Sequence, residues 1–313
     1  MFFLASKIHD PFLNLATEDY LLHESRSDFI FLYINDPSVI VGKHQVAQKE
    51  VNIRFTIENH IPVVRRISGG GTVYHDRGNL NFTFIRQSSS GKQIDFKRYI
   101  EPIVEFLNSL GINATAGIKN DIRVGDLKIS GNAEHVFRER VLHHGTLLFD
   151  TSLDDMRLAL RPAIDNYTTR AVESNRTNVL NLKDCLPGHD TFEFMKLLAG
   201  WFKKTVSGLE DFELTGKDLE HVESLAVNKY RTWEWNWGYA PPYNMKTSVL
   251  INGEFIQCSI GVKDGIITSC SFDGKLADKG DLLVGCRHDF IEVSSRLAAI
   301  IPGDYKEELY KLF

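Results

Sequence analysis

The stretch VRRISGGGTVYHDRGNLNFTFI, residues 64–85, decides the fold and points to a binding site. Glycine permits positive φ and close approach of the backbone to a neighbour, but it costs conformational entropy, so three in a row need a reason. Residues 61–67 read as a strand, and residues 80–84 alternate between apolar and polar side chains with the two-residue period of a strand. We therefore expect the glycines to join two strands in a hairpin, with no helix N-terminus behind them.

Two known phosphate-binding motifs do not fit this stretch. A P-loop requires G-x-x-x-x-G-K-[ST], and a dinucleotide-binding loop requires G-x-G-x-x-G between a strand and a helix. An anion bound here would instead need backbone amides in a concave loop, helped by Arg65 or Arg66. The alternative is that the glycines only make a turn.

The composition of the chain is that of an ordinary globular protein. Its 313 residues are 43% hydrophobic and 25% charged, which excludes the disordered and fibrous classes. A chain of this length exceeds the usual size of a single core, so we expect one large domain and a small one. The net charge of -5 argues against non-specific nucleic-acid binding, because the phosphate backbone of a nucleic acid would be repelled.

The spacing of the cysteines and the lengths of the apolar runs predict the compartment of the protein. Cys185, Cys258, Cys270 and Cys286 form no C-x-x-C pair, so the sequence signals neither a zinc cluster nor a disulfide framework. No stretch approaches the roughly 18 apolar residues of a membrane helix, and the start of the chain lacks a secretory pattern. We therefore expect a soluble, cytoplasmic protein with reduced thiols and with no membrane or nucleic-acid partner.

Hydrophobic periodicity predicts a mixed α/β chain. Helical spacing occurs at residues 12–24, 99–110, 191–206 and 215–227, and strands are expected at residues 29–35 and 38–45. The segment WEWNWGYAPPYN, residues 233–244, combines three tryptophans with a proline pair, which favours packing and a rigid connection. After it, Asn-Gly and Asp-Gly turns predict hairpins, and residues 290–301 predict a closing helix. We therefore expect a large domain over residues 1–245 and a small α+β domain over residues 246–313.

The segment NDIRVGDLKIS, residues 120–130, predicts a hairpin with two different faces. The expected cross-strand pairs are Val124 with Leu127, Arg123 with Lys128, Ile122 with Ile129, and Asp121 with Ser130. One face is then apolar, and the other collects every polar side chain of the two strands. Asp121 and Lys128 are diagonal neighbours on the polar face, within reach of one anionic ligand or of each other. The equally weighted alternative is a solvated outer face.

Two further clusters carry weaker signals. His143 and His144 precede an apolar strand, where paired histidines are more often packed than bound to a ligand, and no further metal ligands lie at a suitable spacing. Residues 174–182, SNRTNVLNL, offer hydroxyl and amide groups that could contact a sugar or a phosphate. Most such loops are only turns.

Taken together and in order, these segments resemble one known family. RRISGGGTVYHDRGN, then NDIRV, LKISGNA, HHGTLLFD and a late loop ending in RTN are similar to the motifs of the lipoate-protein ligases and their lipoyltransferase relatives. The resemblance covers roughly the first 245 residues, and WEWNWGYAPPY looks like the end of that family's catalytic domain. Each motif alone is modest, but five in register are specific.

The resemblance implies a fold and a reaction. The fold would be an α/β (α+β) mixed sheet flanked by helices, similar to biotin protein ligases and class II tRNA synthetases, with a small α+β accessory domain at the C-terminus. The reaction would use ATP and Mg²⁺ to convert lipoate into lipoyl-adenylate. The lipoyl group would then pass to a lysine of a lipoyl domain, in the glycine cleavage H protein or in the E2 subunits of 2-oxo acid dehydrogenases.

The resemblance also implies the site residues. Lys128 would be catalytic, because its compact ammonium can follow the negative charge from the attacking carboxylate to the acyl-phosphate oxygen. Asp121 would orient Lys128 or hold Mg²⁺ on the nucleotide side, and His144 would lie near the adenylate phosphate. Arg66 and Ser68 would hold the loop and the carboxyl end. The remaining binding residues implied are Gly69, Gly70, Gly71, Thr72, Val73, Tyr74 and Asn79.

Three alternatives stay open on the sequence. Related octanoyl and lipoyl transferases use a cysteine nucleophile and no ATP, but the motif segments that carry the resemblance contain no cysteine. A lipoyltransferase could accept premade lipoyl-AMP. A ligand-binding regulator without activity is the third, although the sequence shows no DNA-binding helix pair and no basic face. An ATP-dependent ligase is the favoured interpretation.

Overall fold

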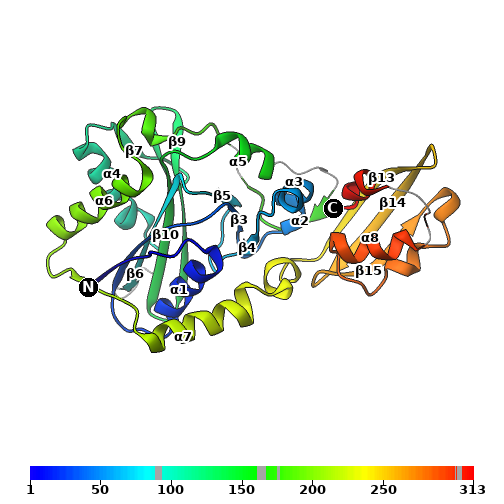
Figure 1. Cartoon of the computed structure of the whole chain (residues 1–313), viewed down its shortest axis with the longest axis horizontal. Coiled ribbons are helices and arrows are strands. Elements are labelled where there is room, and N and C mark those ends of the chain that lie inside the picture. Colours follow the sequence, from blue (N-terminus) through cyan, green and yellow to red (C-terminus); the bar gives the residue numbers. More distant parts are fainter. Residues whose placement is uncertain (89–93, 161–166, 175–176, 300, 302–304) are drawn as a thin grey trace.

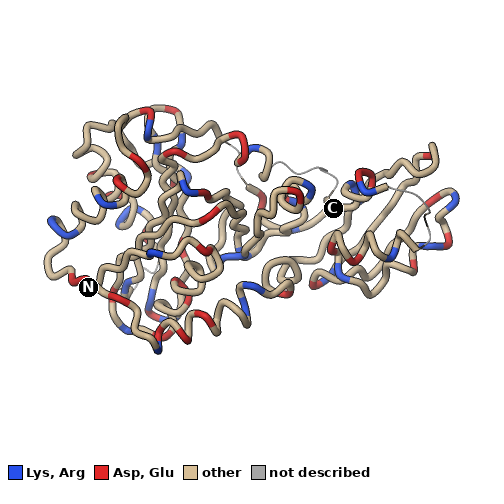
Figure 2. The backbone as a smooth tube through the Cα atoms, in the orientation of Figure 1, with Lys and Arg blue, Asp and Glu red and all other residues tan. Residues whose placement is uncertain are grey.

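The computed structural model describes residues 1–88, 94–160, 167–174, 177–299, 301 and 305–313. Figure 1 shows a larger part built around one long sheet and a smaller part at the C-terminal end of the chain. Acidic and basic residues are interspersed along the backbone of both parts (Figure 2), in line with the small net charge. No helix in the described part of the chain is long and apolar enough to cross a membrane.

The larger part is organised by an eight-stranded mixed sheet in the order β12-β1-β2-β6-β10-β9-β8-β7. Its central strands β2, β6, β10 and β9 are antiparallel, whereas β1 runs parallel to β2 and to β12. The bounds are β1 (Phe2–Ala5), β2 (Phe29–Ile34), β6 (Asn79–Gln87), β7 (Ala114–Ala116), β8 (Asp121–Val124), β9 (Leu127–Phe137), β10 (Arg140–Leu148) and β12 (Glu210–Asp211).

Helices cover both faces of this sheet because its central strands are apolar on both sides. In β2, Ile30 and Leu32 pack with α4 and α6, while Phe29 and Phe31 pack with α1 and α7. The helices are α1 (Pro11–His23), α4 (Phe96–Ser109), α6 (Thr191–Thr205) and α7 (Gly216–Leu225), so all four helices predicted from periodicity are confirmed within a few residues. Asp10 caps α1 by accepting hydrogen bonds from two backbone amides of its first turn.

The glycine segment is not the hairpin that the sequence predicts. β4 (Val63–Arg65) lies parallel to β3 (Ser38–Val41), and β5 (Val73–His75) lies antiparallel to the other edge of β3. The glycines therefore cross over the end of β3, because β3 occupies the central position in this small sheet. The local pattern could not show the correct pairing, since the partner of both strands lies at least 22 residues earlier in the chain.

Short elements fill the space between the small sheet and the C-terminal part. They are α2 (Ala47–Glu50), α3 (Ile53–Glu58), α5 (Leu153–Ala159) and β11 (Tyr167–Thr169). Beyond them come β13 (Tyr243–Ile251), β14 (Glu254–Lys263), β15 (Ile266–Phe272), α8 (Phe290–Ala298) and α9 (Lys306–Leu309). Two-residue turns join β13 to β14 and β14 to β15, with positive φ at both residues of Asn252-Gly253 and of Asp264-Gly265. Both predicted hairpins and the closing helix are confirmed.

The two parts share a core and a sheet. β11 pairs with β13, so residues before 245 contribute a strand to the C-terminal sheet in the order β11-β13-β14-β15. Val39 and Val63 of the small sheet belong to the same hydrophobic cluster as Ile260 and Phe313. The division into residues 1–245 and 246–313 is a proposal, and its boundary falls inside β13.

The tryptophan-rich segment packs against the small sheet, as its composition predicts. Arg65 donates from its backbone amide to Oδ1 of Asn236 at 2.8 Å, and its guanidinium donates to the carbonyls of Trp235 and Asn236. In return, Trp235 Nε1 donates to the carbonyl of Arg65 at 2.7 Å. Arg65 is therefore a structural residue that fixes this segment, and it takes no part in binding an anion.

The β8–β9 hairpin forms, but part of its predicted register is wrong. Val124 pairs with Leu127 and Arg123 with Lys128 as expected, after which Ile122 pairs with Ser130 and Asp121 with Gly131. A bulge inserts one extra residue into β9, which shifts the rest of the pairing by one position. Such a bulge depends on the neighbouring strands and leaves no mark in the alternating pattern.

Candidate functional site

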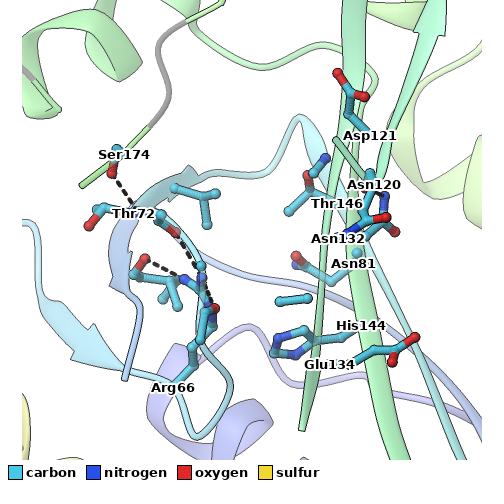
Figure 3. Close-up of a pocket in the computed structure, with 18 of the residues that line it drawn as sticks. Arg66, Thr72, Asn81, Asn120, Asp121, Asn132, Glu134, His144, Thr146 and Ser174 are labelled. Atoms are coloured by element: carbon cyan, nitrogen blue, oxygen red, sulfur yellow. Dashed lines mark hydrogen bonds between the residues drawn. The ribbon is translucent and has the colours of Figure 1, made fainter. Parts of the chain in front are cut away.

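A cavity of about 380 Å³ lies between the large sheet and the glycine segment. Its walls come from Leu15 on α1, from β2, β6, β9 and β10, from residues 69–73 of the glycine segment and from residues 172–174 and 177. Figure 3 shows the labelled side chains in order along the sheet, from Asp121 through Asn120, Thr146 and Asn81 to His144 and Glu134. Segments far apart in the sequence therefore face one cavity.

Arg66 holds the glycine segment in shape. Its Nη2 donates to the carbonyls of Gly69 at 2.6 Å and Gly71 at 2.8 Å, its Nη1 donates to the carbonyl of Ile40 and its Nε donates to Ser68 Oγ. Burial lowers the pKa of Arg66 to about 10, which leaves it charged at neutral pH. The sequence expectation that Arg66 holds the loop agrees with this geometry, and its donors are largely used on the protein itself.

The glycines are needed first for contacts with the protein's own backbone. Gly70 has φ of +88°, and a Cβ on the neighbouring Gly42 would lie 2.0 Å from the carbonyl oxygen of Gly70. A Cβ on Gly71 would lie 3.0 Å from Ser174 Oγ, which also accepts a hydrogen bond from the backbone amide of Thr72 at 2.8 Å. The close approach predicted for this loop is therefore present, and residues 42 and 174 are two of the neighbours it approaches.

A buried chain of hydrogen bonds lies at one end of the cavity. His144 donates from Nδ1 to the carboxylate of Glu18 at 3.0 Å, and its Nε2 accepts from Ser68 Oγ at 2.6 Å. Tyr33 donates to the same carboxylate at 3.0 Å. Ser68 is fully buried and acts through Arg66 and His144, so it does not line the cavity. His144 does line it.

Lys128 reaches the cavity from the start of β9. A Cβ on Gly131 would lie 3.3 Å from Lys128 Nζ, so the glycine leaves room for the amine over the strand. Burial lowers the pKa of Lys128, and the nearby carboxylate of Asp121 opposes part of that shift. The backbone amide of Lys128 donates to the carbonyl of Asn178, and its carbonyl accepts from the amide of Leu180. The late polar loop is thereby attached directly to the lysine.

Asp121 lies beside Lys128 and is held by Arg123. Arg123 Nε donates to Asp121 Oδ2 at 2.8 Å, whereas the buried Oδ1 has no hydrogen-bond partner among the described residues. No group of three or more His, Cys, Asp or Glu side chains in the described ranges could hold a metal ion. A Mg²⁺ ion commonly takes one or two carboxylates plus phosphate oxygens, and Asp121 brings one carboxylate to the cavity lining.

Two further residues expected at the site lie elsewhere. Tyr74 points away from the cavity and packs in the core that contains Val39, because side chains alternate along β5 and its neighbours Val73 and His75 face the cavity. Asn79 is fully buried and donates to Asn81 Oδ1 at 3.0 Å, so it supports Asn81, which lines the cavity. Neither Tyr74 nor Asn79 lines the cavity, contrary to the expectation that both contact the ligand directly.

Several lining residues were missed from the sequence. Tyr33, His75, Asn81, Asn132, Glu134 and Thr146 each come from a strand whose cavity-facing side is decided by the fold. Ser174 belongs to the polar loop over residues 174–182, whose sequence signal for binding is weak. Residues 175 and 176 of that loop lie outside the described residues. A useful signal was available for polar residues inside apolar strands, such as Asn81 between Leu80 and Phe82, because burial of an amide requires a partner.

Comparison with known proteins agrees with this geometry. The family model described as Lipoyl protein ligase A/B catalytic domain matches residues 10–203. Lipoate--protein ligase 1 of Staphylococcus aureus is 40% identical over 305 residues, covering 94% of this chain and 92% of that protein.

Two solved structures share the fold. A bi-partite lipoate protein ligase with its E2 lipoyl domain from Thermoplasma acidophilum is 28% identical with a TM-score of 0.65, covering 76% of this chain and 96% of that one. Lipoate-protein ligase A bound with ATP is 29% identical with a TM-score of 0.64, covering 76% and 98%. The fold is that of a class of ligases that attach a carboxylic acid to a protein. The chain belongs to the lipoyl protein ligase A/B family, which confirms the resemblance in its motifs.

Proposed function

We propose that the cavity forms lipoyl-AMP from lipoate and ATP and then passes the lipoyl group to a lysine of a lipoyl domain. Membership of the family makes the chain an ATP-dependent lipoate-protein ligase. The observation that carries the assignment of the chemistry to this cavity is the partly buried amine of Lys128. Lys128 lines the same cavity as the glycine segment, its backbone is bonded to the polar loop, and the carboxylate of Asp121 is nearby.

The proposed reaction has two steps at one place. The lipoate carboxylate attacks the α-phosphorus of ATP, so that a C–O–P link forms and diphosphate leaves. The neutral amine of the acceptor lysine then attacks the carbonyl carbon, an amide bond forms, AMP leaves and the amine proton passes to solvent. Negative charge develops on neighbouring oxygens in both steps, and a fixed ammonium such as Lys128 stabilises it in both.

Asp121 is the proposed ligand for Mg²⁺. A Mg²⁺ ion held by Asp121 would supply positive charge that offsets the negative charge of the departing diphosphate. Asp121 can also hold the ammonium of Lys128 in place through its charge. Arg123 fixes the orientation of this carboxylate by donating to its Oδ2.

The proposed acceptors are lipoyl domains of E2 subunits and the glycine cleavage H protein. The structural analysis of the Thermoplasma acidophilum lipoylation system covers a lipoate protein ligase and its E2 lipoyl domain, which supports the first of these. We place the reaction in the cytoplasm, where ATP is available and where the free cysteines of this chain would stay reduced.

Lipoate-dependent release of diphosphate from ATP tests the proposal. Without an acceptor, the purified protein should release about one equivalent per active site and then stop, because the adenylate stays bound. Addition of a lipoyl domain should restart turnover. No release, combined with transfer from supplied lipoyl-AMP, would instead identify a transferase that accepts the premade adenylate.

Replacement of all four cysteines by serine should leave ligation intact. The cavity lining contains no cysteine among the described residues, and Cys185 is exposed outside it, whereas Cys258 and Cys286 are buried in the C-terminal part. A thioester mechanism would need one of these thiols as the nucleophile. Ligation is measured on the soluble fraction, with lipoate binding as a check of folding. A folded Cys185→Ser protein that binds lipoate but cannot transfer it would restore the thioester mechanism.

Activity should fall on the alkaline side at a lower pH than an exposed lysine would require. Burial holds the pKa of Lys128 below the ordinary value of about 10.4, so the ammonium is lost as pH rises through this lowered pKa. Diphosphate release is the correct readout, because it does not depend on ionisation of the acceptor lysine. Arginine has an intrinsically higher pKa than lysine, so the alkaline fall in the weaker activity of Lys128→Arg should lie at a higher pH. The same fall in Lys128→Arg would assign the titration to another group.

A further inference from the structure

His75 places a buried, unused nitrogen at the wall of the cavity. The residue is 3% exposed and lines the cavity from β5, and its Nε2 has no hydrogen-bond partner among the described residues. A buried polar nitrogen left without a partner costs free energy, because it has lost its hydrogen bonds to water. A ligand that supplied the partner would recover this cost on binding.

The proton on His75 can be assigned by following hydrogen bonds from a backbone carbonyl. Asn14 contacts the carbonyl of Ile8 at 2.9 Å, and a carbonyl only accepts, so the contacting atom of Asn14 is its amide nitrogen. The same nitrogen donates to Asn35 at 2.8 Å, which makes the contacting atom of Asn35 its oxygen. The other amide atom of Asn35 is then a donor, and it faces His75 Nδ1 at 3.0 Å. His75 therefore accepts at Nδ1 and carries its proton on Nε2.

The ring is neutral as well as oriented. Burial, followed by the nearby charge of Arg66 and the His144 ring, lowers the pKa of His75 to about 3. At neutral pH, His75 is thus a fixed N–H donor without a charge. It is suited to an uncharged hydrogen-bond acceptor.

The end of the acyl chain that is farthest from the carboxylate is the part of the substrate that would reach His75 Nε2. His75 is held by Asn35 just after β2, whereas Lys128 lies on β9, three strand spacings or about 14 Å across the sheet. At the Lys128 end the two cations Lys128 and Arg123 face the single carboxylate of Asp121, which favours an anionic group. At the His75 end the charge of Arg66 is offset by Glu18, which favours a neutral group.

The lining at this end is otherwise apolar or already paired. Leu15 and Ile40 present hydrocarbon to the cavity, and the Tyr33 hydroxyl is committed to Glu18. An alkyl chain therefore fits here, with one acceptor near its far end. Divalent sulfur is a weak hydrogen-bond acceptor, while the terminal methyl of a fatty acid accepts nothing.

We propose that His75 Nε2–H donates to a dithiolane sulfur and makes the site prefer lipoate to octanoate. This inference rests on the proposed function of the cavity as a lipoate site. It makes His75 a specificity-determining residue, which contacts the substrate remote from the reacting carboxylate. Octanoate would fill the same space but leave the buried donor unpaired, which is how a polar site rejects an apolar analogue.

A matched pair of amide variants tests the role of each ring nitrogen. His75→Asn keeps an acceptor for Asn35 near the position of Nδ1 and removes the Nε2 donor, whereas His75→Gln can keep a donor near Nε2. Binding of lipoate and of octanoate is measured by calorimetry on each protein, beside kcat/KM for diphosphate release with each acid. The wild-type ratio of lipoate to octanoate affinity should fall about tenfold in His75→Asn, and His75→Gln should retain most of it.

The outcomes separate this inference from the proposed function. Equal weakening of both acids in His75→Asn, or an unchanged ratio, overturns the specificity role. A wild-type protein that releases no diphosphate overturns the proposed function, while the calorimetric ratio still decides the role of His75. A ratio that falls in His75→Asn and is restored in His75→Gln supports the inference, because a purely structural role would affect both acids alike.

Discussion

Lys128→Ala should slow both half-reactions on the order of 10²-fold to 10³-fold, which is typical for removal of one preorganised group that stabilises developing charge. The amine reaches the cavity beside Asp121, and the packing of β9 depends on its apolar neighbour Ile129, which is fully buried. The fold should therefore remain intact. Diphosphate release and transfer from premade lipoyl-AMP are measured separately, because a group that serves both steps must affect both.

Two further variants sharpen this result. Lys97→Ala is the neutral control, because Lys97 is an exposed residue of α4 whose ion-pair partner in the described part of the chain is Glu101, and surface pairs contribute about 0–1 kcal/mol. Arg123→Ala should give an intermediate loss, since Arg123 orients Asp121. Near-normal transfer by Lys128→Ala, or a larger loss in Arg123→Ala, would show that the reacting oxygens lie elsewhere in the cavity.

The parts of the fold that sequence reasoning predicts correctly are those fixed by local chemistry. The β13–β14 and β14–β15 hairpins follow from Asn-Gly and Asp-Gly, because few other residue pairs adopt positive φ twice in succession. The helix over residues 96–109 ends before Gly111, which has φ of +81°. In each case the signal and its cause lie within a few residues of each other.

Pairings between distant segments are what the sequence leaves open. β3 separates the two strands that flank the glycines, and the β9 bulge moves Asp121 from Ser130 to Gly131. Both features depend on which strands are neighbours in the folded sheets, and no periodicity records that choice. β11 likewise joins β13 from about 75 residues earlier in the chain, so the boundary expected at residue 245 crosses a strand.

The site shows the same division between local and distant information. Contiguous motifs place Arg66, Thr72, Lys128 and His144 at the cavity, whereas Glu18 arrives from α1 to bind His144 across 126 residues. A helix pattern treats Glu18 as an ordinary polar position. Its burial at 1% exposure becomes evident only when α1 is packed on the sheet.

Arg66→Ala should lower the free energy of unfolding by about 3–5 kcal/mol and abolish lipoate binding at ordinary concentrations. The variant leaves the buried carbonyl of Ile40 without its donor, and it releases Gly69 and Gly71 from the guanidinium that holds them together. The glycine segment would then lose the shape that closes the cavity. Thermal unfolding should shift down by roughly 10 °C, and calorimetry with lipoate measures the binding loss.

Comparison of Arg66→Lys with Arg66→Ala decides whether directed hydrogen bonds or the positive charge hold the glycine segment. Arg66→Lys keeps the charge but replaces the planar fork by a single ammonium, which cannot reach the carbonyls of Ile40, Gly69 and Gly71 together. We expect it to lose nearly as much stability and binding as Arg66→Ala. Arg77→Ala is the control, because Arg77 is half exposed and its ion-pair partner among the described residues is Asp36 on the surface, so the change should cost at most about 1 kcal/mol. If Arg66→Lys behaved like the wild type, the positive charge and not the set of directed hydrogen bonds would be what holds the glycine segment.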